Sequence, residues 1–213
     1  MECIGLISNK YLRERKGKQL MSTVFLPKTH YINGKSKTAP QLLAKLLEQL
    51  ISTSFSPDTK PVIVCIGSNR VPGDSLGPLV GTRLSRKKDF FLPVYGTLNF
   101  PIHALNLNDA MRAIKEIHPG SPVIAIDASL GSRRHLNYIT VSSGSLFPGA
   151  GVNKDLGAVG DIAITGIINT SGELAQLALQ STRLSTVINL AEHIAEGILL
   201  AAFLYSEKPA KFS

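Results

Sequence analysis

Two aspartates of this chain each follow a short apolar run, and this arrangement could bring two carboxylates together. Asp74 comes shortly after the run Val62–Ile66, and Asp127 closes the run Pro122–Asp127. Both runs have the continuous apolar character of strands that are buried on both faces of a parallel sheet. Because open α/β sheets keep their ligands outside the carboxyl ends of the strands, we expect both carboxylates in one crevice.

Such a pair could do chemistry in two ways. Two neighbouring carboxylates share a proton, because ionising both is electrostatically unfavourable, so one can act as a base toward water and the other as an acid. The same oxygens could instead hold a divalent metal. A third interpretation is structural: Asp74 or Ser75 would cap the helix that starts near Leu76, and Asp127 would accept hydrogen bonds from loop N–H groups. The residue types alone leave all three open.

Other candidate groups carry weaker signals. His103, in a long loop after a proline, is a weak candidate for a third site group or metal ligand, and the remaining histidines show no paired ligand spacing. Neither the dinucleotide spacing G-x-G-x-x-G nor the phosphate-binding G-x-x-x-x-G-K-[ST] occurs, so no nucleotide and no cofactor is expected.

The glycine-rich stretch 143–161 is longer than an ordinary connector of about 4–6 residues, which makes a binding loop plausible. Its backbone amides could cradle a peptide or an anion, and the alternative is a tight structural loop. We assign substrate binding to four of its residues: Gly149, Ala150, Gly151 and Asn153.

The elements that must position these groups alternate along the chain. Helical spacing of apolar residues predicts helices at about 40–51, 75–86, 109–117 and from 184 onward, with a shorter helix from Gly172. Further strands are expected at Phe91–Tyr95, Tyr138–Ser142 and Ile162–Ile168. This alternation predicts an α/β fold, a three-layer α/β/α sandwich with a mostly parallel sheet.

Charge and composition narrow the function classes. The formal charge is +8, but residues 1–60 hold ten Lys or Arg and four Asp or Glu, so the basicity is concentrated near the start. We therefore expect a basic, flexible arm over residues 1–39, a single α/β domain over 40–205 and a tail over 206–213. The absence of Trp and the low aromatic content argue against a stacking platform for single-stranded nucleic acid.

Two further features indicate a cytoplasmic protein. Cys3 and Cys65 form no disulfide framework, which suits a reducing compartment. The sequence shows no signal peptide and no apolar segment of the roughly 20 residues needed to cross a bilayer, so no membrane association is expected.

Five blocks of the sequence resemble the YyaC family of sporulation proteins in spore-forming Firmicutes. The blocks cover about residues 61–200, in the family's order: IGSNRVPGDSLGPLVG, FLPVYGTLNFPIHALNL, VIAIDASLG, LFPGAGVNKDLGAVGDIAITGIIN and LQSTRLSTV. That family is in turn similar to the spore germination protease, an atypical aspartic peptidase, and more distantly to hydrogenase maturation endopeptidases. The germination protease motifs P-D-A-L-G-P, I-D-A and P-G-S-G-V match residues 73–78, 126–128 and 148–152.

This resemblance implies a phosphorylase/hydrolase-like fold and a sporulation-associated aspartic endopeptidase with Asp74 and Asp127 as its catalytic pair. Its partner would be a protein or peptide substrate, such as a spore protein, in the cytoplasm of the forespore or mother cell. The alternatives are a catalytically silent binding or regulatory protein on the same fold, and a metal-dependent hydrolase or maturation factor. Residues 136–192 contain no histidine, so the metal-binding histidine of the maturation enzymes has no counterpart there.

Overall fold

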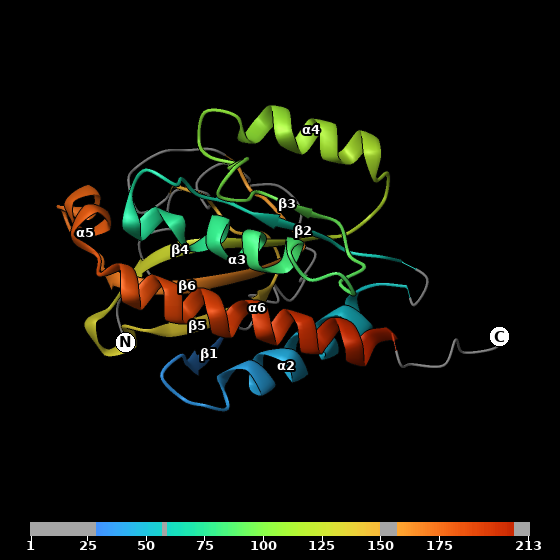
Figure 1. The fold of residues 1–213 in the computed structure, drawn as a ribbon, viewed down its shortest axis with the longest axis horizontal. Coiled ribbons are helices and arrows are strands. Elements are labelled where there is room, and N and C mark those ends of the chain that lie inside the picture. The colour runs from blue at the N-terminus through green and yellow to red at the C-terminus, as the bar shows by residue number, and fades with distance from the viewer. Residues whose placement is uncertain (1–28, 57–58, 150–156, 207–213) are drawn as a thin grey trace, which may run out of the picture.

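The protein is built on a six-stranded sheet with the strand order β1-β5-β6-β4-β2-β3. The computed structural model describes residues 29–56, 59–149 and 157–206 (Figure 1). Its strands are β1 (His30–Asn33), β2 (Val62–Cys65), β3 (Val94–Tyr95), β4 (Val123–Gly131), β5 (Tyr138–Ser143) and β6 (Ile162–Thr170). Strands β3, β2, β4 and β6 are parallel, and only β5 runs against its neighbours β6 and β1. The expected mostly parallel sheet is confirmed.

Helices lie on both faces of this sheet, which gives the predicted three layers (Figure 1). One face packs against α2 (Ala39–Ser54), α3 (Leu76–Ser85) and α6 (Leu184–Ser206), and the other against α4 (Leu107–Ile117). Because side chains alternate along a strand, Ile124 and Ile126 of β4 join the first apolar cluster, whereas Val123 and Ala125 join the second. A short helix, α5 (Ala175–Ser181), contacts the 3-10 helix η1 (Pro72–Ser75) and β6.

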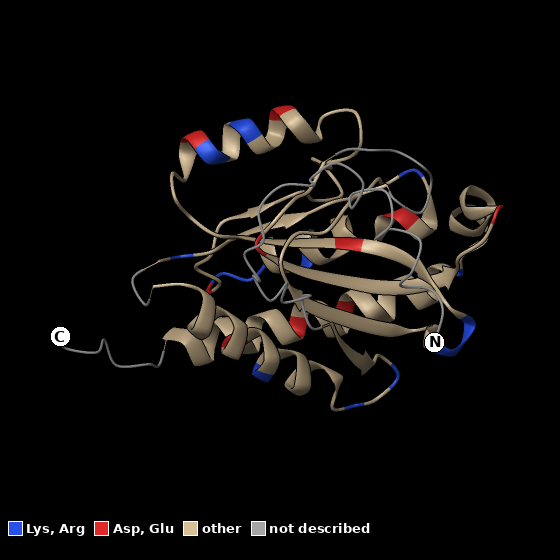
Figure 2. Cartoon of the chain, turned by 180° about the vertical axis from the view of Figure 1, so that it is seen from behind, with Lys and Arg blue, Asp and Glu red and all other residues tan. Residues whose placement is uncertain are grey.

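The strands are almost free of charge. Among the residues of the six described strands, Asp127 is the one Asp, Glu, Lys or Arg. In Figure 2 the other charged residues that the structure describes lie on helices and in connecting segments. A charged residue type inside an apolar sheet is costly unless it is paired or neutralised, so Asp127 needs a specific explanation.

The expectation of a flexible arm over residues 1–39 is wrong for residues 30–33. Residues 30–33, placed in the arm by their sequence, form the edge strand β1, and Ile32 of this strand is only 4% exposed. β1 pairs antiparallel with β5, and α2 begins at Ala39. Residues 30–33 therefore belong to the folded unit that the sequence places from residue 40. Residues 1–28 and 207–213 lie outside the described residues, and Ser206, expected in the C-terminal tail, is the last residue of the helix that begins at Leu184.

Helix α6 corrects the expectation that no segment has the length and apolar composition to cross a membrane. It is 23 residues long and is long and apolar enough to cross a membrane. Half of its most apolar 18-residue segment is nevertheless buried within the fold. Val187, Ile194 and Ile198 of α6 belong to the core cluster shared with α2 and α3. Packing in the core accounts for the apolar face of this helix.

Candidate functional site

A crevice opens where β2 ends and β4 continues. β2 pairs in parallel with β4 from Val62–Val123 to Cys65–Ile126, and Asp127 is the next residue of β4. On its other side β4 goes on pairing with β6 as far as Gly131. The chain leaves β2 toward β3 and leaves β4 toward β5, so the two connections diverge. Such switch points, at the carboxyl ends of parallel strands, are the usual binding sites of open α/β sheets.

A tightly folded loop holds Asp74 against the end of β2. The Asp74 N–H donates to the carbonyl of Val71 at 3.0 Å, and the Asp74 carbonyl accepts the N–H of Ser68 at 2.9 Å. Gly67 has φ +140°, and a Cβ at this position would overlap the Asp74 carbonyl oxygen. Gly77 leaves similar room for the backbone of Ile66, so the first turn of α3 packs directly on the strand. These glycines fix the position of Asp74.

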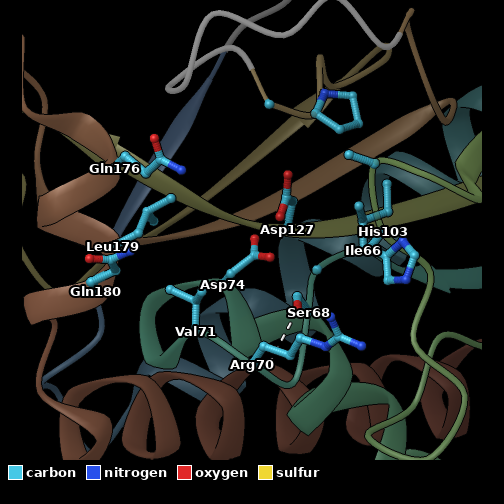
Figure 3. Close-up of a pocket in the computed structure, with 14 residues that line it drawn as sticks. Ile66, Ser68, Arg70, Val71, Asp74, His103, Asp127, Gln176, Leu179 and Gln180 are labelled. Carbon is cyan, nitrogen blue, oxygen red and sulfur yellow. Dashed lines mark hydrogen bonds between the residues drawn. The ribbon is translucent and has the colours of Figure 1, made fainter.

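The two carboxylates face one another across the crevice (Figure 3). Asp127 is only 9% exposed, and its Oδ1 accepts the N–H of Ala128 at 2.7 Å. Burial raises the pKa of Asp127 well above its ordinary value of 3.8, the negative charge of Asp74 raises it further, and the Ala128 N–H partly opposes both. Asp127 therefore retains a proton at pH values where an exposed aspartate has lost it. The half-buried Asp74 supplies the charge beside it.

The structural interpretation of these aspartates is only partly met. Ser75, not Asp74, occupies the N-cap position of α3, and no side-chain cap bond forms there. The Ser75 hydroxyl instead donates to the carbonyl of Pro72 at 2.7 Å. Asp127 does accept one backbone N–H, from its own neighbour Ala128. Ser75 therefore occupies the cap position without forming a capping bond.

The walls of the crevice combine apolar and polar side chains around a cavity of about 310 Å³. Apolar contributions come from Ile66, Val71 and Leu179, and polar ones from Arg70, Gln176 and Gln180. The two glutamines were missed by the sequence analysis, although their i, i+4 spacing places them on one face of α5. Because Gly73 has no side chain, the backbone of Leu179 can approach it closely. This close approach lets α5 pack against η1 and brings the glutamine face of α5 to the aspartates.

One of the four predicted substrate-binding residues is placed at the crevice. Gly149 lines it together with Pro148 and has φ +75°, a left-handed conformation that favours glycine. Ala150, Gly151 and Asn153 lie outside the described residues. Their assignment to substrate binding stays a prediction.

His103 lines the crevice but does not join the aspartates. Figure 3 shows its ring beside Ile66 and turned away from the carboxylates. Its backbone N–H donates to Asn106 Oδ1 at 2.8 Å, and its Nδ1 accepts the N–H of Leu105 at 3.3 Å. Within the described part of the chain, no three His, Cys, Asp or Glu side chains gather in a metal-binding arrangement. His103 is thus not placed as a third metal ligand.

Cys65, at the end of β2, is not available as a nucleophile. The side chain is fully buried, and burial raises the pKa of its thiol, which keeps it in the unreactive protonated form. Cys65 is therefore not a candidate for nucleophilic chemistry at the end of β2.

Comparison with known proteins identifies relatives over most of this fold. The family model described as "Protein of unknown function (DUF1256)" matches residues 31–197. A Bacillus subtilis (strain 168) protein, described as "Uncharacterized protein YyaC", is 45% identical over 159 residues. That similarity covers 74% of this chain and 78% of the relative. The region matched by the family model contains both aspartates and the walls of the crevice.

Proposed function

This chain belongs to the YyaC (DUF1256) family, and we propose that it is an endopeptidase of the aspartic type. Asp74 and Asp127 would be its catalytic pair. One observation carries the proposal. A buried carboxyl whose pKa is raised faces a second carboxylate that contributes to the rise, in a crevice at the switch point of the sheet. Paired titratable groups whose environments separate their pKa values are the usual acid and base of a hydrolytic site.

The arrangement assigns a role to each aspartate. Asp74, as the charged partner, accepts a proton from water while the water oxygen attacks the carbonyl carbon of the peptide bond. Asp127, which holds its proton, donates it to the amide nitrogen as the C–N bond breaks. The products are a carboxylic acid and an amine, and transfer of the proton gained by Asp74 back to Asp127 restores the starting state. No further reactant is required.

The walls of the crevice suit a peptide substrate. The side-chain amides of Gln176 and Gln180 can each donate and accept hydrogen bonds, as a peptide backbone requires. Gly149 exposes backbone without a side chain on another part of the lining. Because the motifs around Asp74 and Asp127 also resemble those of the spore germination protease, we propose a protein of sporulating cells as the substrate.

The test incubates the purified protein with an extract of sporulating cells and identifies newly formed termini by mass spectrometry. We compare the wild type with Asp74→Asn and Asp127→Asn, because each change removes a titratable group with little change in side-chain volume. Both variants should lose cleavage while circular dichroism shows that both remain folded. Asp109→Asn, a change at an exposed aspartate of α4, should retain it.

Two results would contradict the proposal. Cleavage that persists in either folded variant would show that the carboxylate pair is not the catalyst. Absence of cleavage by the wild type, at every pH between about 4 and 8, would favour a binding or regulatory protein on the same fold, since fold does not fix function.

A further inference from the structure

A second, larger groove runs between α4 and the loop that follows β3. Its volume is about 630 Å³, within the range of roughly 300–1,000 Å³ that is usual for ligand pockets. The floor includes the buried residues Ile102 and Ile114. Phe100 and Ile117, which also line the groove, are 80% and 61% exposed, so large apolar surfaces there remain open to solvent.

The lining of this groove contains no Asp, Glu, Lys or Arg among the described residues. Its polar members are His103 and uncharged side chains such as Tyr95, Thr97 and Asn106. Two of these already have partners, because the Tyr95 hydroxyl is hydrogen-bonded to His118 at 2.8 Å and the Asn106 amide donates to Pro101 at 3.0 Å. Without an Asp, Glu, Lys or Arg among the described residues of its lining, the groove offers a charged ligand little compensation for lost hydration. It therefore suits apolar, uncharged groups.

The groove adjoins the crevice of the aspartates. His103 lines both cavities, and the adjacent Ile102 is paired with Ile66, whose side of the crevice lies next to Asp127. The Gly67 N–H donates to the Ile102 carbonyl at 2.8 Å, which ties the floor of the groove to the loop that holds Asp74. His103 and Ile102 therefore place the groove beside the crevice.

We propose that this groove binds apolar side chains of the substrate, on one fixed side of the peptide bond that is cut. This inference rests on the proposed peptidase function and specifies the class of peptide sequence that the protein cleaves. The preferred substrate carries aliphatic or aromatic residues, without charge, in the segment that passes His103. An apolar peptide segment is the occupant that matches both the largely apolar lining and the position of the groove beside the crevice of the aspartates.

Two groove variants and one matched control test the proposal. Phe100→Ser and Ile117→Ser remove exposed apolar side chains from the groove, so neither should unfold the protein. Phe203→Ser makes the same change at a residue of α6 that is 60% exposed and does not line the groove. The probe is a library of synthetic dodecapeptides with randomised positions.

Two readouts separate the groove from the chemistry. The first is the cleavage profile of the library by mass spectrometry. The second is capture of the same library on immobilised Asp74→Asn protein, with and without each serine substitution, which requires binding but no turnover. We expect apolar residues to be enriched at one fixed position. A loss on the order of tenfold in kcat/KM for such peptides should accompany Phe100→Ser, with no loss for Phe203→Ser.

The outcomes distinguish this inference from the proposed function. Cleavage without a positional apolar preference, or a preference that survives both groove variants, refutes the groove and leaves the peptidase standing. Capture of apolar peptides that depends on Phe100, without cleavage by the wild type, supports the groove and refutes the peptidase. Absence of both cleavage and capture refutes both. A dimer in analytical ultracentrifugation that Phe100→Ser dissociates would assign the groove to a second copy of the chain instead.

Discussion

Replacing Asp127 with Asn should stabilise the protein, and the gain should grow as the pH rises. The folded state raises the pKa of Asp127 above its value of 3.8 in an exposed chain, so the folded protein keeps a proton that the unfolded chain releases. Below pH 3.8 both states are protonated and the carboxyl carries no penalty. As the pH rises toward the pKa of the folded state the fold loses stability, and above that pKa the penalty stays constant. The amide that replaces the carboxyl in the Asp127→Asn variant is neutral throughout.

The slope of this effect follows from the proton linkage. Between the two pKa values, each pH unit costs the wild type about 1.4 kcal/mol relative to the variant. In a domain of this size, that corresponds to a difference of roughly 3–6 °C in melting temperature per pH unit. The substitution itself should cost little, because an Asn side-chain oxygen can still accept the N–H of Ala128, which lies 2.7 Å from Oδ1.

The assay is urea unfolding of the wild type and Asp127→Asn at pH intervals between about 4 and 8, where the linkage should be visible. Asp109→Asn is the control, because the exposed Asp109 side chain should give a difference that is small and nearly independent of pH. In an Asp74→Asn background the stability difference that Asp127→Asn produces should stop growing at a lower pH. The reason is that one of the two causes of the raised pKa of Asp127 is removed. A difference that is flat with pH, or a wild type that gains stability over the variant as the pH rises, would refute a protonated Asp127.

Two further substitutions test how the fold positions the pair. Gly67→Ala should destabilise the protein by roughly 1–3 kcal/mol or more and reduce activity, because φ +140° is strained for alanine and its Cβ would displace the Asp74 carbonyl; urea unfolding with near-wild-type stability would contradict this. Ile32→Ala should cost about 2–5 kcal/mol in the same measurement if β1 is an integral strand, whereas a change below about 0.5 kcal/mol would return residues 30–33 to the arm.

The central part of the fold could be predicted because local pattern and final environment agree there. The apolar run Val62–Ile66 becomes β2, buried on both faces, and the run ending at Asp127 becomes the first half of β4. Two parallel strands with their carboxyl ends at one edge are sufficient to bring the following residues together. For this reason the juxtaposition of Asp74 and Asp127 was accessible from the sequence alone.

The remaining features depend on distant partners. His30–Asn33 has no marked apolar alternation, and it becomes a strand because it pairs with β5, more than a hundred residues away in the chain. Phe91–Tyr95 is reduced to the two residues Val94–Tyr95, since Pro93 lacks the N–H that a ladder requires. Gln176 and Gln180 reach the crevice only because Gly73 lets α5 approach η1. The pairing of β1 with β5 and the approach of α5 to η1 have no local signal, whereas Pro93 is visible in the sequence.

The position of Asp127 connects the stability argument with the function. β2 ends before the position that would pair with Asp127, so the Asp127 side chain opens into the crevice. On the other side β4 goes on pairing with β6, which keeps Asp127 in the sheet and nearly buried. A purely structural residue at this place would gain from being apolar or amide, because the carboxyl destabilises the fold above its ordinary pKa. The carboxyl of Asp127 instead weakens the fold once the pH is above its ordinary pKa, and the charge of Asp74 contributes to this effect. Such an arrangement is expected where a protonated acid is needed beside a charged base.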